Sequence, residues 1–160
     1  MKAFSQELYD TDDKAKHLII DYLESNGWDA WVNPDKYGID LLALDPNGIE
    51  YQVEVEVKHN WTGDRFPYPT LHFSERKQKF IDGQRMTLFM TINHDLTHAL
   101  VAFEQELSEA RTIVKDTSYT KQEKFLEVSS HSRQLALSET SELTLLLSKA
   151  VLCPSFFSLL

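Results

Sequence analysis

The feature that most constrains this chain is the tetrapeptide DPNG at 45–48, which separates two apolar runs. Proline suits the second position of a type I turn, and glycine adopts the left-handed conformation that follows such a turn. The tetrapeptide therefore predicts an antiparallel hairpin with a three-residue loop, formed by strands at 39–44 and 49–58. A loop of this length sets Asp45 opposite Ile49, which determines the register of the whole hairpin.

This register gathers charged side chains on one face of the hairpin. Counting back from the turn sets Asp40 opposite Glu54, and residues that lie opposite each other in an antiparallel pair share a face. Glu56 and Lys58 follow at every second position, so they lie on that face too. Asp40 and Glu56 form a diagonal pair about 7 Å apart, a gap that two carboxylates can close around one ion. A two-residue loop would instead turn Asp40 toward the valines.

Two carboxylates and an ammonium group arranged in this way suit phosphodiester hydrolysis with a divalent metal ion. Carboxylates held together repel each other, and a bound cation relieves that repulsion. Oxygen ligands suit Mg²⁺ or Mn²⁺, which can lower the pKa of a bound water and stabilise charge on a phosphate. The ammonium group of Lys58 could orient the attacking water. The same alternation is also typical of the solvated face of an ordinary antiparallel strand.

The rest of the sequence predicts a single α/β or α+β domain over 1–160, with a central mixed β-sheet flanked by helices. A loop at 59–73 carries several aromatic residues, and 110–116 and 124–130 are either short edge strands or irregular. The C-terminal part, 138–160, is expected to be a helix followed by an apolar extension. The remaining predicted elements are helices at 12–25 and 74–82 and strands at 28–33, 86–93 and 98–104.

Composition narrows the functions that the chain could have. A net charge of −9 argues against a protein that coats nucleic acids by charge alone, although a local basic patch would still allow contact with DNA. The one cysteine, Cys153, excludes an internal disulfide and fits a reducing compartment. The first ten residues hold acids where a signal peptide would be apolar, and no window suits a membrane span. We therefore expect an intracellular protein.

With Asp40 before one strand and Glu56-Val57-Lys58 on the next, the chain resembles the PD-(D/E)XK nuclease superfamily. That superfamily includes restriction endonucleases, Holliday junction resolvases and repair nucleases, and its order of elements is similar to the one predicted here. The resemblance implies a restriction endonuclease-like core and a Mg²⁺-dependent nuclease that acts on DNA in repair, recombination or restriction. It implies that Asp40, Glu56 and the carbonyl oxygen of Val57 bind the metal, and that Lys58 is the catalytic lysine.

The resemblance also points to accessory residues. Many members carry a glutamate on the first helix, where this chain has Lys16, with Asp13 one turn earlier as a weak substitute. Many resolvase-like members carry a glutamine on the helix after the motif, and Gln78 is its counterpart here. Glu54 is either an accessory acid or a solvated neighbour. Three basic residues around Gln78 predict a local patch for DNA phosphates: Arg76, Lys77 and Lys79.

Other features have a simple structural interpretation beside a functional one. His94, Asp95 and His98 resemble metal ligands, but they lie at a predicted hairpin turn, which favours a structural role. The aromatic loop at 59–73 could stack on bases, but such loops more often pack on their own core. The apolar tail at 143–160 would pack on the core, or would form a homodimer contact, since cutting two strands often uses two sites.

Two further functions stay open at this point. The chain could keep the nuclease fold only as a binding or interaction module, which the acidic net charge and the missing helical glutamate favour. It could also be an acidic protein that inhibits a DNA-binding partner by imitating phosphate charge. That function predicts acids spread over one face, whereas the acids here converge on Lys58.

Overall fold

The computed structural model describes residues 5–130, 134–139, 143 and 147, so most of the predicted C-terminal helix and extension at 138–160 lies outside the described residues. None of the helices in the described part of the chain is long and apolar enough to cross a membrane. The elements, in chain order, are α1 (Gln6–Ser25), β1 (Asp29–Val32), β2 (Leu41–Leu44), β3 (Glu50–Lys58), β4 (Thr70–Ser74), the 3₁₀ helix η1 (Glu75–Phe80), β5 (Met86–Asn93), β6 (His98–Phe103), α2 (Glu104–Ser108), β7 (Arg111–Lys115), β8 (Glu123–Ser129) and β9 (Gln134–Ala136).

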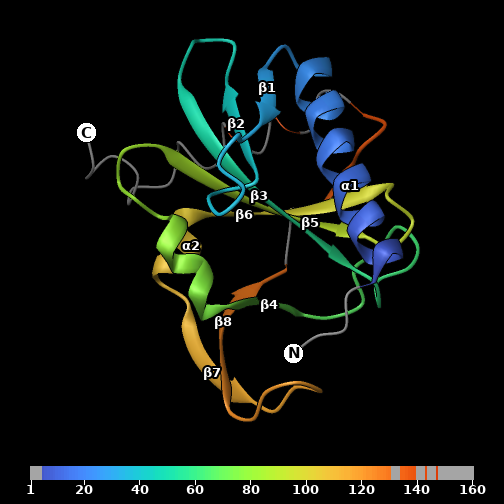
Figure 1. The fold of residues 1–160 in the computed structure, drawn as a ribbon, viewed down its shortest axis with the longest axis vertical. Helices are drawn as coiled ribbons and strands as arrows, with labels where there is room; N and C mark the ends of the chain where they lie inside the picture. The colour runs from blue at the N-terminus through green and yellow to red at the C-terminus, as the bar shows by residue number, and fades with distance from the viewer. Residues whose placement is uncertain (1–4, 131–133, 140–142, 144–146, 148–160) are drawn as a thin grey trace.

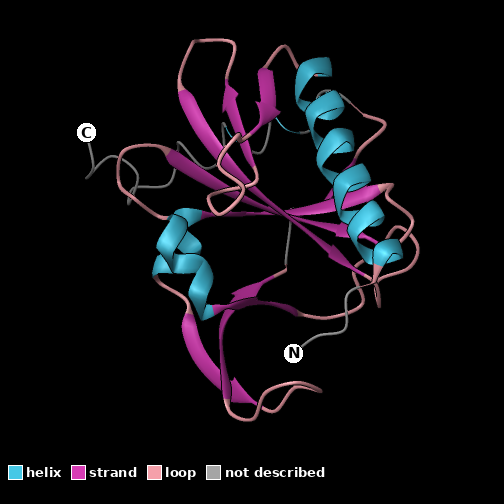
Figure 2. Ribbon diagram, in the orientation of Figure 1, coloured by secondary structure: helices cyan, strands magenta, loops and turns pink. Residues whose placement is uncertain are grey.

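These elements form two sheets. The larger one has six strands in the order β1-β2-β3-β5-β6-β9, and the smaller has three in the order β4-β8-β7. In the larger sheet β3 and β5 are parallel and the other neighbours are antiparallel, so the predicted mixed sheet is confirmed. Helix α1 lies along one side of this sheet, while β7 and β8 project from the opposite end of the molecule (Figure 1). Figure 2 shows the same arrangement, with the strands in magenta and the helices in cyan.

The six-stranded sheet separates two apolar cores. Along β5, Leu88 and Met90 pack in the core that includes α1, whereas Phe89 packs in the core that includes β4 and β8. All three side chains are buried. A strand that is covered on both faces carries a continuous apolar run rather than an alternating one, which explains the sequence MTLFMTIN.

The first hairpin has the register that its turn predicts. Leu41 pairs with Val53, and the amide of Asp45 donates to the carbonyl of Ile49 at 3.0 Å. Gly48 has a φ of +80°, the left-handed conformation expected after the type I turn. The three-residue loop is therefore confirmed.

Three local predictions differ from the structure. Helix α1 begins at Gln6 rather than at Asp12, because the side chain of Ser5 accepts a hydrogen bond from the amide of Leu8 and caps an earlier turn. The helix predicted at 74–82 is the shorter 3₁₀ helix η1. The segment predicted as a loop at 59–73 ends in strand β4. Leu71 and Phe73 of this strand are buried in the core, and the residues next to them are more exposed.

Candidate active site

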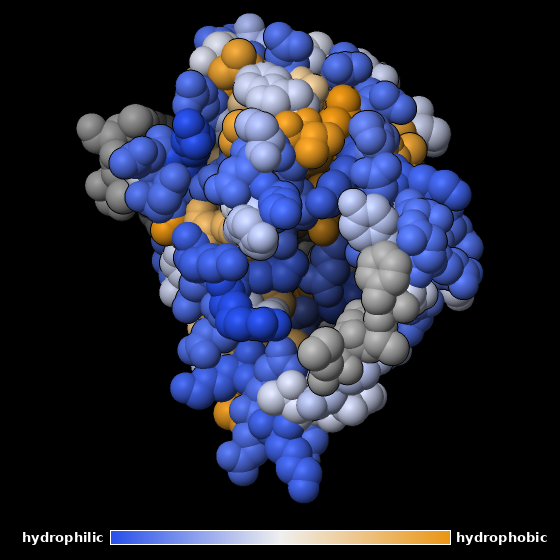
Figure 3. Space-filling model, in the orientation of Figure 1, coloured by the Kyte–Doolittle hydropathy of each residue, from blue (hydrophilic) through white to orange (hydrophobic). Residues whose placement is uncertain are grey.

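The residues predicted for catalysis lie on one face of the hairpin. Asp40 comes directly before β2, and extending the register of β2 and β3 by one residue sets it beside Glu54. Glu54, Glu56 and Lys58 follow on the face of β3 that is turned toward η1, since Gln52 on that face donates to the carbonyl of Phe80. One face of the molecule is hollowed near its centre, and the side chains inside the hollow and on its left are mostly hydrophilic (Figure 3).

Asp40 is held by both of its carboxylate oxygens. Oδ1 lies 2.7 Å from the ammonium nitrogen of Lys16 on α1. Oδ2 accepts a hydrogen bond of 2.9 Å from the backbone amide of Val55 on β3. Two charge-assisted contacts from different elements fix the direction of the carboxylate, so the side chain points along the edge of β3 where the pairing with β2 has ended.

Lys77 of η1 reaches into the same site. Its ammonium nitrogen lies 3.0 Å from Oε1 of Glu54 and 3.1 Å from Oε2 of Glu56. The other oxygen of Glu56 accepts from Lys58 at 2.9 Å. We call these residues the carboxylate–lysine cluster: it joins three acids and three lysines, namely Asp40, Glu54, Glu56, Lys16, Lys58 and Lys77.

Burial and nearby charges shift the pKa values of the two glutamates of the cluster in opposite directions. Burial raises the pKa of Glu54 to about 7, the charge of Asp40 adds to this, and the ammonium of Lys77 only partly opposes it. Burial also acts to raise the pKa of Glu56, but Lys77 and Lys58 outweigh it, so that pKa lies below its usual range. At neutral pH Glu56 is therefore ionised, while Glu54 is close to half-protonated.

Comparison with solved structures identifies the fold. Hjc, a Holliday junction resolvase from the archaeal hyperthermophile Archaeoglobus fulgidus, matches with a TM-score of 0.51 over 80% of this chain and 93% of that chain. The two sequences are 10% identical. The match spans most of both chains. This chain has a restriction endonuclease-like fold. No protein-family model and no curated protein matches the sequence, so the fold rests on the structural comparison and not on sequence similarity.

Within this restriction endonuclease-like fold, the carboxylates of the cluster are the chemical type of ligand that a hard divalent ion prefers. The carboxylates of Asp40 and Glu56 are the preferred ligands of Mg²⁺ and Mn²⁺. The amide of Val55 points away from β5 toward Asp40, and Val57, two residues further along, presents its carbonyl to the same side. Because Lys77 binds both Glu54 and Glu56, this part of the site already attracts a cation. Among the described residues no three acids, histidines or cysteines stand close enough together to hold an ion as the side chains lie.

Of the accessory residues predicted from the sequence, Glu54 belongs to the cluster, whereas Asp13 and Gln78 make their contacts elsewhere. Asp13 is exposed on α1 and lies 3.8 Å from His17. Gln78 donates to the carbonyl of Leu107 on α2 at 3.5 Å. Of the predicted basic patch, Arg76 is exposed on η1 and the ammonium of Lys79 lies over the ring of Phe80. Lys77 alone turns inward, to the cluster.

The histidine-rich turn has the structural role that was favoured. The side chain of Asn93 accepts from the amides of Thr97 and His98 at 2.8 and 3.0 Å, which closes the turn between β5 and β6. Asp95 accepts from the amide of Gly63 at 2.7 Å and so ties this turn to the aromatic loop. That loop packs partly on its own core, because Trp61 is fully buried.

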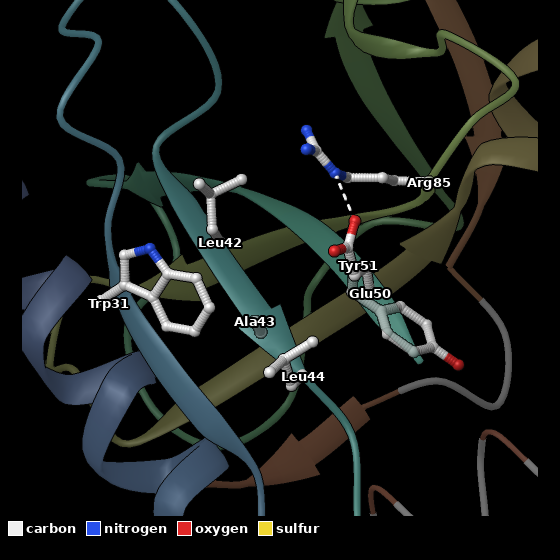
Figure 4. A pocket seen from close by; sticks show the side chains of 7 residues that line it. All are labelled: Trp31, Leu42, Ala43, Leu44, Glu50, Tyr51 and Arg85. Carbon is white, nitrogen blue, oxygen red and sulfur yellow. Dashed lines mark hydrogen bonds and ion pairs between the residues drawn. The ribbon is translucent and has the colours of Figure 1, made fainter. Parts of the chain in front are cut away.

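A second hollow lies at the far end of β3 from Lys58. It has a volume of about 110 Å³ and is lined by residues of β1, β2 and β3 together with Arg85. Figure 4 shows Trp31 and Leu42 on one side and the ion pair of Arg85 with Glu50 on the other. Glu50 starts the strand that Lys58 ends, so this hollow is separate from the carboxylate–lysine cluster.

Sequence reasoning missed two members of the cluster. Lys16 was noted only as the residue in the place of a family glutamate, and Lys77 only as part of a basic patch. The helical period sets Lys16 next to the buried residues Ala15 and Ile19, so its position beside the core could be foreseen. Nothing local in the sequence shows that Lys77 turns toward β3, because that contact joins two separate elements.

Proposed function

We propose that this protein is a metal-dependent nuclease that hydrolyses DNA phosphodiester bonds in recombination, repair or restriction inside the cell. The observation that carries the proposal is that Asp40, Glu56 and Lys58 share one face of the first hairpin in a restriction endonuclease-like fold. The structural neighbour Hjc is a Holliday junction resolvase, which favours recombination or repair among these settings.

In this proposal Asp40, Glu56 and the carbonyl of Val57 hold Mg²⁺ or Mn²⁺. A bound ion of this kind lowers the pKa of a water molecule and stabilises charge on the phosphate. Asp40 must then release Lys16, which lies 2.7 Å away, and Glu56 must release Lys77, at 3.1 Å. Lys58, at the end of β3, is left to orient the attacking water or to neutralise the phosphate.

The DNA itself would be held by cations outside the cluster. The side chain of Arg76 on η1 is 85% exposed, so its guanidinium is accessible to a phosphate. Lys79 lies two residues further along the same element. A homodimer, which would place two sites on the two strands of one substrate, is part of the same proposal.

Cleavage of a supercoiled plasmid and of labelled oligonucleotides, with and without Mg²⁺, tests this function. Asp40→Asn, Glu56→Gln and Lys58→Met should each lower the rate by about a hundredfold or more, since each removes a charge at the reacting centre. Glu50→Gln is the matched control, because Glu50 lies on the same strand but pairs with Arg85 away from the cluster. Activity that survives in both Asp40→Asn and Lys58→Met would refute the mechanism.

One observation favours the alternative, a nuclease fold retained as a binding module. Each acid of the carboxylate–lysine cluster already has a lysine partner, so the site is balanced in charge without a metal ion. Calorimetric titration with Mn²⁺ separates the two functions. A nuclease should bind the ion at a site that Asp40→Asn abolishes, whereas an inert scaffold should show no specific binding.

A further inference from the structure

A groove of about 360 Å³ opens beside the candidate active site, where β3 ends. Lys58 and Asn60 line it on the side of β3, and Phe66 and Tyr68 line it from the aromatic loop. His72 on β4 and Lys115 at the end of β7 also line it, together with residues 69–71. The groove thus joins the catalytic lysine of the six-stranded sheet to the three-stranded sheet, within the volume range of small-ligand sites.

An aromatic series supports one wall of this groove. Trp61 is fully buried, and the ring of Phe66 meets it edge-on with centroids 5.2 Å apart. Tyr68 meets Phe66 in the same way at 5.6 Å and is itself 48% exposed. Edge-to-face contacts of this kind hold rings in fixed orientations. An exposed aromatic ring is therefore anchored to the core at the groove.

The opposite wall holds a positioned ammonium group. Nε2 of His72 lies 3.1 Å from a carboxylate oxygen of Glu127. A carboxylate only accepts hydrogen bonds and an ammonium group only donates them, so Nε2 donates to Glu127 and Nδ1 is the acceptor. Nδ1 accepts from Lys115 at 2.9 Å, and the ring of Phe125 lies 4.3 Å from the same ammonium group. Lys115 is therefore held in place by two neighbours.

We propose that this groove binds one nucleotide of the DNA strand next to the scissile phosphate, with its base on Tyr68 and its phosphate on Lys115. The inference rests on the proposed nuclease function and adds a substrate class to it. A base can lie on the ring of Tyr68 only when it has left the duplex stack, so the groove selects single-stranded or unpaired nucleotides beside the cut. Stacking on an aromatic face tolerates any base, so the preference concerns strandedness and not sequence.

Binding of a single-stranded oligonucleotide in EDTA tests the groove without the metal reaction. The probe carries 2-aminopurine, and affinity is measured by anisotropy at several salt concentrations. Tyr68→Ala should weaken binding about tenfold, while Tyr68→Phe keeps the ring and stays near the wild type. Lys115→Gln should lower the slope of log affinity against log salt by about 0.7.

Lys124→Gln is the matched control for Lys115. It removes the same charge from the same sheet, but Lys124 precedes Phe125 on β8 and so projects from the opposite face of that strand. It should therefore leave both affinity and salt slope near those of the wild type. Circular dichroism of each variant shows whether it folds, and Lys115→Arg, which keeps the charge, should retain the wild-type slope.

The two proposals fail in different ways. The groove proposal is wrong if the wild type does not bind the single strand. It is also wrong if the wild type, Tyr68→Ala and Lys115→Gln bind with equal affinity. In either case the nuclease function still stands if Mg²⁺-dependent cleavage is seen. A binding pattern as expected, without cleavage under any metal condition, would overturn the nuclease function and support the groove as a site for unpaired nucleotides.

Discussion

Replacing Glu54 by glutamine measures how strongly burial acts on the carboxylate–lysine cluster. The pKa of Glu54 rises to about 7 in the folded protein, mainly through burial, from about 4.3 in an unfolded chain. The folded state holds the proton of Glu54 more tightly than the unfolded chain does, and this difference stabilises the fold. The stabilisation is fully present below the pKa of Glu54 in the unfolded chain, and it is lost as the pH rises through the pKa of Glu54 in the folded protein. At about 1.36 kcal/mol for each pKa unit, the total loss is about 4 kcal/mol.

Glutamine has the shape of the protonated acid and does not titrate, so Glu54→Gln should lack this pH dependence. Between pH 5 and pH 8 the wild type should lose about 2 to 3 kcal/mol of unfolding free energy relative to the variant. Comparing the two proteins at both pH values cancels any constant effect of the amide on packing or on Lys77. The stabilising effect of Glu56, whose pKa is lowered and which loses stability in acid, is common to both proteins.

Urea unfolding followed by tryptophan fluorescence, in EDTA at four pH values from 5 to 8, gives the required free energies. Glu50→Gln serves as control, because the side chain of Glu50 is 63% exposed and its curve should run parallel to that of the wild type. If the curve of Glu54→Gln also runs parallel to the wild type, burial does not hold a proton on Glu54 and the electrostatic description of the cluster is wrong.

Three further substitutions test the structure at other points. Lys77→Gln leaves Glu54 and Glu56 facing each other and should destabilise the protein by about 1 to 3 kcal/mol in urea unfolding at pH 8. This loss is smaller than the one expected when a fully buried ion pair is broken, because the site is partly exposed. An unchanged unfolding midpoint would contradict this expectation. Gly48→Ala forces alanine into a φ of +80° with no atom within 4 Å of the new methyl group, so the expected loss of about 1 to 2 kcal/mol is purely conformational. Asn93→Ala removes a fully buried side chain that closes the turn after β5, and unpaired backbone groups should lower stability by about 2 to 4 kcal/mol in the same assay.

The hairpin could be predicted because its information is local. The tetrapeptide at 45–48 determines loop length, and loop length determines which side of β3 faces Asp40. The charged face of β3 follows from the two-residue period of a strand, and Gly48 adopts the positive φ that the turn type requires. No contact with a distant part of the chain was needed to foresee this register.

The three-stranded sheet could not be foreseen in the same way. Strand β4 pairs with β8 so that Leu71 lies opposite Val128, and the two segments are far apart in the sequence. Each segment alone is a short alternation of apolar and polar residues, which is equally typical of an exposed loop edge. Only the burial of Leu71 and Val128 against the same core distinguishes the paired strands from irregular chain.

The lysines of the cluster give the candidate site its most specific physical property. The ammonium group of Lys77 compensates Glu54 and Glu56 without a metal. It would therefore compete with the divalent ion that we propose for this site. Lys16 pairs with Asp40 and would compete with a bound ion for that carboxylate in the same way. A site of this kind gains less free energy from the ion than a bare group of carboxylates would, because each new metal–oxygen contact replaces an existing ion pair. Removal of Lys77 should for this reason weaken the fold in EDTA while it strengthens the binding of Mn²⁺, two opposite effects that a simple loss of structure would not produce together.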